Sequence, residues 1–262
     1  MPNVVIAPTL QTMSAMYALT RDGGPQSERF AAYVARVEQE WGLVAYNPMA
    51  GDAARETVTQ LLSLDAENVA RNIAAHTAML CEYEQQITLA LVVRSKGMWT
   101  DRIATEVDDR FSTKRARPDH GLVSMWSRES CHLDDVTREV VAEVVRVMWA
   151  SMHGASDRME ALFAREGLAY AIAARVCNVE PHGGSPSMEE RALVSYALEM
   201  LRGTRLQSDV VGILYGDDVA TTMGFDTLGI GDRAGYRVAI AQAADRVRLV
   251  GAAHALRNGA PT

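Results

Sequence analysis

The stretch from Ser63 to Gly97 constrains the fold of this chain more than any other part of the sequence. Apolar side chains recur along it at the spacing expected for one face of an α-helix. They are Val69, Ile73, Leu80, Ile87 and Leu91. A glycine such as Gly97 typically follows the last turn of a helix. The pattern therefore predicts one long helix over 63–97.

The rest of the chain shows the same periodicity, interrupted by glycine and proline. Further helices are expected over 30–41, 52–62, 100–111, 134–153, 156–167, 188–202 and 232–257. Only Val4 to Ile6 and Leu122 to Met125 have weak strand character. The sequence thus predicts an all-α protein, a multi-helix bundle.

Two helical units are expected, over 1–111 and 133–262, which either stay separate or pack as one domain. Residues 112–132 are interpreted as a linker, because basic residues, Pro118 and Gly121 cluster there without periodicity. Each unit has a long helix, a glycine and then a Ser/Thr-Asp-Arg start, as in Thr100 to Ile103. An old duplication would explain this similarity between the two units. So would the general preference for Ser or Thr at the start of a helix and for glycine just after its end.

Composition excludes several classes of function. The formal charge of −7 argues against a nucleic-acid partner. No apolar run is long enough to cross a bilayer and no secretory signal precedes the first helix, so we expect no membrane partner and a cytoplasmic location. The three cysteines lack zinc-ligand spacing and no phosphate-binding glycine loop is present, so no metal and no cofactor are expected.

Polar residues interrupt the apolar face of the 63–97 helix. On helical geometry His76, Tyr83 and Glu84 fall on or beside that face, where a desolvated carboxyl group has a raised pKa. Enzymes tune a general acid or base in this way, so these three are the candidate catalytic residues. The alternative is that Glu84 pairs with an arginine from another helix and His76 is a core residue.

Three more residues are candidates for binding a substrate. Cys81 lies beside the same face, with no helix terminus to activate its thiol, so a binding or structural role is favoured over a nucleophilic one. Arg102 could hold a carboxylate in a two-pronged contact, or form a surface salt bridge. His153 ends a helix, where the helix dipole favours its protonated form and an anion beside it.

The residues from Leu64 to Cys81-Glu82-Tyr83-Glu84 resemble the core helix of the alkylhydroperoxidase D and carboxymuconolactone decarboxylase superfamily. The segment Glu189 to Leu198 is similar to a later helix of that family. The resemblance places Cys81 at the first cysteine of the family motif and Glu84 at the second. The family's histidine would fall near Thr88 and its upstream glutamate near Ala70, with Glu67 the closest acid. Without a second thiol, the family's disulfide chemistry is not expected here.

These observations predict a metal-independent enzyme that acts on a small carboxylated molecule by acid/base chemistry of the lyase, decarboxylase or isomerase type. The alternative is a non-catalytic helical protein that binds a ligand or a protein partner, favoured by the methionine content and the apolar loop at Tyr46 to Met49. A homo-oligomer is expected in either case, because several helices are apolar on more than one face.

Overall fold

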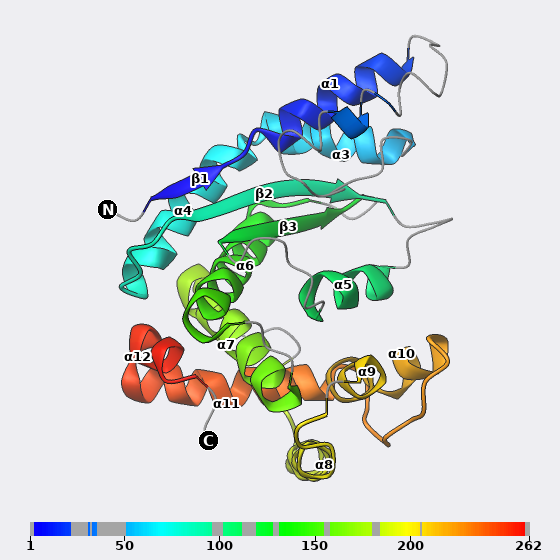
Figure 1. Ribbon diagram of the computed structural model, residues 1–262, viewed down its shortest axis with the longest axis vertical. Coiled ribbons are helices and arrows are strands. Elements are labelled where there is room, and N and C mark those ends of the chain that lie inside the picture. Colours follow the sequence, from blue (N-terminus) through cyan, green and yellow to red (C-terminus); the bar gives the residue numbers. More distant parts are fainter. Residues whose placement is uncertain are drawn as a thin grey trace.

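The computed structural model describes residues 3–21, 31, 33–35, 51–95, 102–111, 119–127, 131–154, 158–179, 184–204 and 206–259. A parallel three-stranded sheet lies between helical layers in strand order β1-β2-β3 (Figure 1). The strands are β1 (Val4–Ile6), β2 (Ile87–Arg94) and β3 (His120–Trp126). The two segments with weak strand character in the sequence therefore lie in β1 and β3. The protein is mostly helical, and the prediction of an all-α fold was wrong for this sheet.

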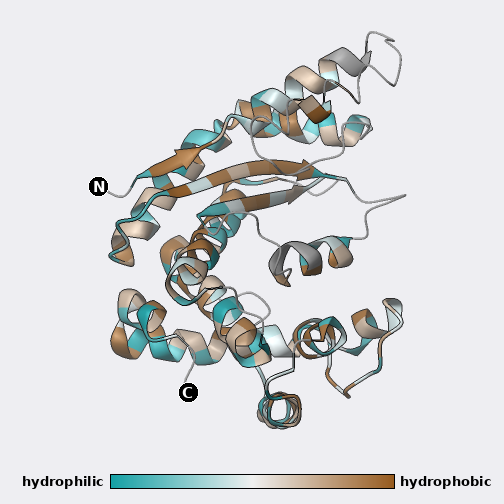
Figure 2. Cartoon of the chain, viewed as in Figure 1, coloured by the Kyte–Doolittle hydropathy of each residue, from teal (hydrophilic) through white to brown (hydrophobic). Residues whose placement is uncertain are grey.

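The long helix predicted over 63–97 divides into a helix and a strand. Helix α4 (Ala66–Leu80) ends at Cys81, and β2 begins six residues later at Ile87. Residues 87–93 are all buried in β2, which lies between two parallel neighbours. A continuous apolar run rich in β-branched residues is typical of such a strand, because both of its faces are covered. Figure 2 shows this apolar character along the length of β2.

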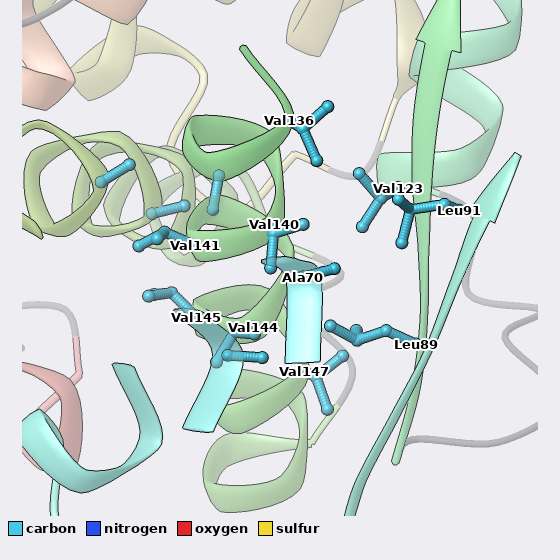
Figure 3. Close-up of a cluster of buried hydrophobic side chains, with 14 of the residues drawn as sticks. Ala70, Leu89, Leu91, Val123, Val136, Val140, Val141, Val144, Val145 and Val147 are labelled. Carbon is cyan, nitrogen blue, oxygen red and sulfur yellow. The ribbon is translucent and has the colours of Figure 1, made fainter. Parts of the chain in front are cut away.

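Helices cover both faces of the sheet. Helices α1 (Thr9–Arg21) and α3 (Asp52–Ser63) contact each other and β2. Helix α6 (Leu133–His153) contacts β2 and β3, and α4 contacts β1 and α6. Leu89 and Leu91 point toward the valines of α6 (Figure 3). Because side chains alternate along a strand, the residues between them face the opposite side of the sheet.

A second layer of helices packs on α6. Helix α7 (Met159–Cys177) contacts α6 and α11 (Ala234–Val250), and α12 (Ala252–Arg257) follows α11. Four further helices contribute to a second apolar cluster: α5 (Arg102–Phe111), α8 (Met188–Met200), α9 (Gln207–Tyr215) and α10 (Asp217–Thr222). Helix α7 contributes to both clusters. It also runs past Gly167, where its end was predicted; a Cβ atom there would lie 2.4 Å from the Ala239 carbonyl oxygen, so the glycine permits close contact with α11.

The structure changes the interpretation of the linker. Residues 120–126, expected to be part of a linker, form β3 and pair with β2 over their whole length. The described strands all precede residue 133, so the two halves do not share one architecture and the structure does not support a duplication. Most of the helix expected over 30–41 and the apolar loop at Tyr46 to Met49 lie outside the described residues. Within the described part of the chain, every helix is too short or too polar to cross a membrane.

Candidate functional site

The three candidate catalytic residues do not share one buried face. His76 is exposed on α4, and Glu84 is exposed in the turn between α4 and β2. Tyr83 is buried, and its hydroxyl donates to Gln85 Oε1 at 3.3 Å. The chain leaves the helix at Cys81, so the helical spacing that grouped these residues does not extend to positions 83 and 84. The desolvation expected for Glu84 is therefore absent.

The turn after α4 contacts helices α6 and α12. Arg257 of α12 donates to Glu82, and the Ser151 hydroxyl of α6 donates to Gln85 Oε1 at 2.7 Å. His153 lies at the same end of α6, with its Nε2 2.8 Å from the Leu256 carbonyl oxygen. Since a carbonyl only accepts, Nε2 carries the hydrogen and donates. These contacts fix α12 against the amino end of β2.

Cys81 lies in the core beneath this turn. It has no exposed surface, and burial raises the pKa of its thiol to about 12. The thiol is therefore protonated at neutral pH and is neither a nucleophile nor a polar contact for a ligand.

Arg102 lies at the opposite end of the sheet. It is the first residue of α5, which follows the carboxyl end of β2. β2 has 8 residues, and at roughly 3.3 Å per residue its two ends lie about 23 Å apart. One small molecule therefore cannot contact both Arg102 and the residues around Tyr83.

Arg102 belongs to a polar group that we name the carboxyl-edge cluster: Arg94, Arg102, Glu106, Ser124 and Trp126. The strand register pairs Arg94 of β2 with Trp126 of β3. The Arg94 Nε donates to the Ser124 hydroxyl at 3.0 Å. The Arg102 guanidinium carbon lies 5.5 Å from the centre of the Trp126 ring, in cation–π geometry. Two arginines from different elements thus contact β3 near its carboxyl end, one at Ser124 and the other at Trp126.

Each arginine of this cluster has an orienting partner. The Arg102 Nε donates to Glu106 Oε1 at 2.8 Å, one helical turn along α5. Arg102 thus forms a salt bridge, as the alternative interpretation expected, but a partly buried one, with the Glu106 side chain 8% exposed and that of Arg102 30% exposed. Parallel strands bring their carboxyl ends to one edge of a sheet, which is where open α/β sheets bind ligands. Guanidinium groups there suit a carboxylate, which they bind through planar paired hydrogen bonds.

A second polar group is fully enclosed between α6 and α7. Glu166 accepts from the Arg146 Nη2 at 2.9 Å and from the Arg165 Nε at 3.0 Å. Arg146 also donates to Glu143 Oε2 at 3.2 Å, and the backbone N–H of Leu122 in β3 donates to Glu143 Oε1 at 3.3 Å. The four charged side chains are at most 8% exposed. This buried ionic network joins the sheet to the second helical layer.

Both groups contain residues that the sequence interpretation missed. Arg94 closes the apolar run of β2, and a charged residue at the end of a buried strand indicates the edge of a sheet. Glu143 and Arg146 stand three residues apart inside a valine-rich helix, a spacing that places both on one face. Trp126 and Ser124 carried no local signal, because their role depends on pairing with β2.

Comparison of the chain with protein-family models, with curated protein sequences and with solved structures gave no match. Among the described residues, no group of three or more His, Cys, Asp or Glu side chains is placed to hold a metal ion. The candidate site therefore rests on the geometry of the carboxyl-edge cluster.

Proposed function

We propose that this protein is a cytoplasmic protein that binds a small carboxylated organic molecule at the carboxyl-edge cluster. The observation that carries the proposal is that Arg94 and Arg102 both contact β3 at the carboxyl end of the sheet, Arg94 through Ser124 and Arg102 through Trp126. The guanidinium groups would hold the carboxylate and the indole ring would contact the organic part. Arg102 keeps the role that the sequence suggested for it, now with Arg94 beside it.

The acid/base enzyme expected from the sequence remains a candidate, but with a different acid/base residue. Tyr83 and Glu84 precede the amino end of β2, about 23 Å from its carboxyl end by the length of the strand, which is too far to share a small substrate with the arginines. His76 is exposed on α4 and, among the described residues, forms no hydrogen bond or ion pair with the cluster. Glu106, hydrogen-bonded to Arg102, is the carboxyl group within the cluster and is the proposed acid/base residue. A non-catalytic binding protein using the same arginines is the second candidate.

The resemblance to the alkylhydroperoxidase D and carboxymuconolactone decarboxylase superfamily does not guide this proposal. That resemblance places the tetrad Cys81 to Glu84 within a helix, whereas here the residues form a turn before a strand. It also assigns chemistry to Cys81, whose thiol is buried and protonated.

Titration calorimetry with succinate and citrate, as di- and tricarboxylate probes, tests the binding. We expect saturable binding by the wild-type protein and a loss of roughly tenfold or more in Arg94→Gln and in Arg102→Gln, since a hydrogen bond to a charged group contributes about 1.5–3 kcal/mol. Arg248→Gln is the matched control, because Arg248 is exposed on α11 and pairs only locally with Asp245. Undiminished affinity in both cluster variants, or no saturable binding of either probe, contradicts the proposal.

Glu106→Gln separates the two candidates once a substrate is known. An enzyme should lose turnover in this variant while retaining much of its substrate affinity, because the amide keeps its carbonyl oxygen for Arg102 but cannot exchange a proton. Turnover at the wild-type rate would remove Glu106 from the chemistry.

A further inference from the structure

Helix α8 carries apolar side chains on two opposite faces. On its inner face Val194 and Ala197 are buried, and the helix contacts α9 and α11. On its outer face every fourth residue from 188 to 200 is exposed and apolar. These residues form what we name the α8 ridge: Met188, Ala192, Tyr196 and Met200. A helix apolar on two faces needs a partner on each of them.

The ridge is strongly exposed and well fixed in place. Met188 is 88% exposed, and Tyr196 and Met200 are each 65% exposed. The Ser187 hydroxyl and the Glu190 carboxylate form a capping box that fixes the first turn of α8. Arg237 of α11 also pairs with Glu190. In Figure 1 α8 is seen end-on at the margin of the molecule, with α9 and α11 on its inner side.

The ridge supplies about half of the area that a stable dimer requires. Met188, Tyr196 and Met200 together offer roughly 450 Å², taking their exposed fractions and about 150–250 Å² for each large side chain. That is within the range for the largest apolar patch on a monomer. A standard interface buries about 800 Å² per partner. The side chains of Arg191, Ser195 and Glu199 lie beside the ridge and widen the surface that a second copy would cover.

The ridge is also complementary to itself. A two-fold axis at the level of residue 194 places Met188 of one copy opposite Met200 of the other, and the small Ala192 opposite the large Tyr196. The antiparallel arrangement opposes the two helix dipoles and brings the acidic first turn, with Glu189, toward the end that carries Arg202.

We propose that the α8 ridge docks a second copy of this chain, forming a two-fold dimer in which α8 packs antiparallel against α8. Closed two-fold pairs are by far the commonest assemblies of identical chains. The carboxyl-edge cluster lies on other elements, so this contact does not depend on the proposed ligand site.

Sedimentation velocity over a wide range of protein concentration tests the dimer. The wild-type chain should be a reversible dimer, and Tyr196→Glu should raise the dissociation constant roughly tenfold or more, because it removes a central aromatic contact. Leu249→Glu is the matched control, since Leu249 is 77% exposed on α11, away from the ridge. Circular dichroism should show that both variants fold.

Disulfide trapping gives a second measurement. Ser195 lies one residue from the proposed axis, so Ser195→Cys should cross-link to its own copy on mild oxidation, far faster than Leu249→Cys. Three results would overturn the proposal: a wild-type monomer at every concentration, a dimer that Tyr196→Glu leaves intact, or equal cross-linking of the two cysteine variants. Binding of the ridge to lipid vesicles or to a different protein by a monomeric chain would overturn it as well.

Discussion

Glu67 shows how one half-buried carboxyl group connects two helices. Its Oε1 accepts a hydrogen bond of 2.8 Å from the backbone N–H of Leu10, in the first turn of α1. Burial raises the pKa of this half-buried group above its usual value, and the Leu10 hydrogen bond and Arg71 only partly oppose that effect. Ionisation of Glu67 therefore lowers the free energy of unfolding, although the carboxylate accepts a hydrogen bond at the N-terminus of α1.

The stability linked to Glu67 should depend on pH in a defined direction. A carboxyl group with a raised pKa contributes stability at low pH that is lost as the pH rises through its folded pKa. Glu67→Gln keeps an oxygen for Leu10 without the charge, so we expect a higher free energy of unfolding than wild type at neutral pH. The difference should vanish below pH 4.5, the usual pKa of the group.

Urea unfolding of the two proteins across this pH range measures the effect. Glu56→Gln is the control, because Glu56 is exposed on α3 and should show no such trend. A Glu67→Gln protein less stable than wild type at neutral pH would mean that the helix dipole outweighs the desolvation.

Helix α6 is the element on which both layers of the molecule pack. Its valines meet Leu89 and Leu91 of β2 (Figure 3), while Arg146 reaches Glu166 of α7. The Arg146 guanidinium also lies 5.2 Å from the centre of the Tyr170 ring. The buried ionic network thus determines how α6 and α7 align.

Removing one member of this network should be costly. Arg146→Met leaves Glu166 and Glu143 buried without their shared cation, and we expect a loss of about 3–5 kcal/mol in the free energy of unfolding. Arg248→Met, which breaks an exposed pair on α11, should change it by about 1 kcal/mol or less. Chemical denaturation of both variants gives the comparison. Similar losses of unfolding free energy in the two variants would show that the buried network contributes no more to stability than an exposed ion pair.

The whole molecule is organised around contacts between its two halves. The predicted boundary segment 112–132 contains β3, and a cut after residue 132 separates the whole sheet from α6, whose side chains cover one face of it. Helix α5, on the N-terminal side, contributes Val107 to the apolar cluster of α7, α9 and α11. Dividing the chain after residue 132 would therefore expose apolar faces on both fragments.

Expression of residues 1–132 and 133–262 as separate fragments tests this organisation. We expect neither fragment alone to show a cooperative thermal transition, because each loses the surface that covers its core. Co-expression should restore a folded complex. Cooperative unfolding of either isolated fragment would instead favour the two separate units considered from the sequence.

Local patterns predicted several helices closely. The start of α8 at Met188 follows from the Ser187 and Glu190 capping box, and α6 was expected over 134–153 against the observed Leu133–His153. Both signals act within one or two turns of chain, so they need no distant partner. The helix expected over 156–167 was less accurate: Gly167 has the appearance of a stop signal, but packing against Ala239 keeps it inside α7.

The sequence by itself determined where apolar faces and helix ends lie, because these depend on neighbours in the chain. Only the tertiary structure decided that 87–94 is a strand. A short apolar run is compatible with a buried helix and with a buried strand, and the hydrogen bonds to β1 and β3 make it a strand here. The carboxyl-edge cluster was decided in the same way. Arg94 and Trp126 meet through strand register, and α5 then brings Arg102 to them, which no local pattern encodes.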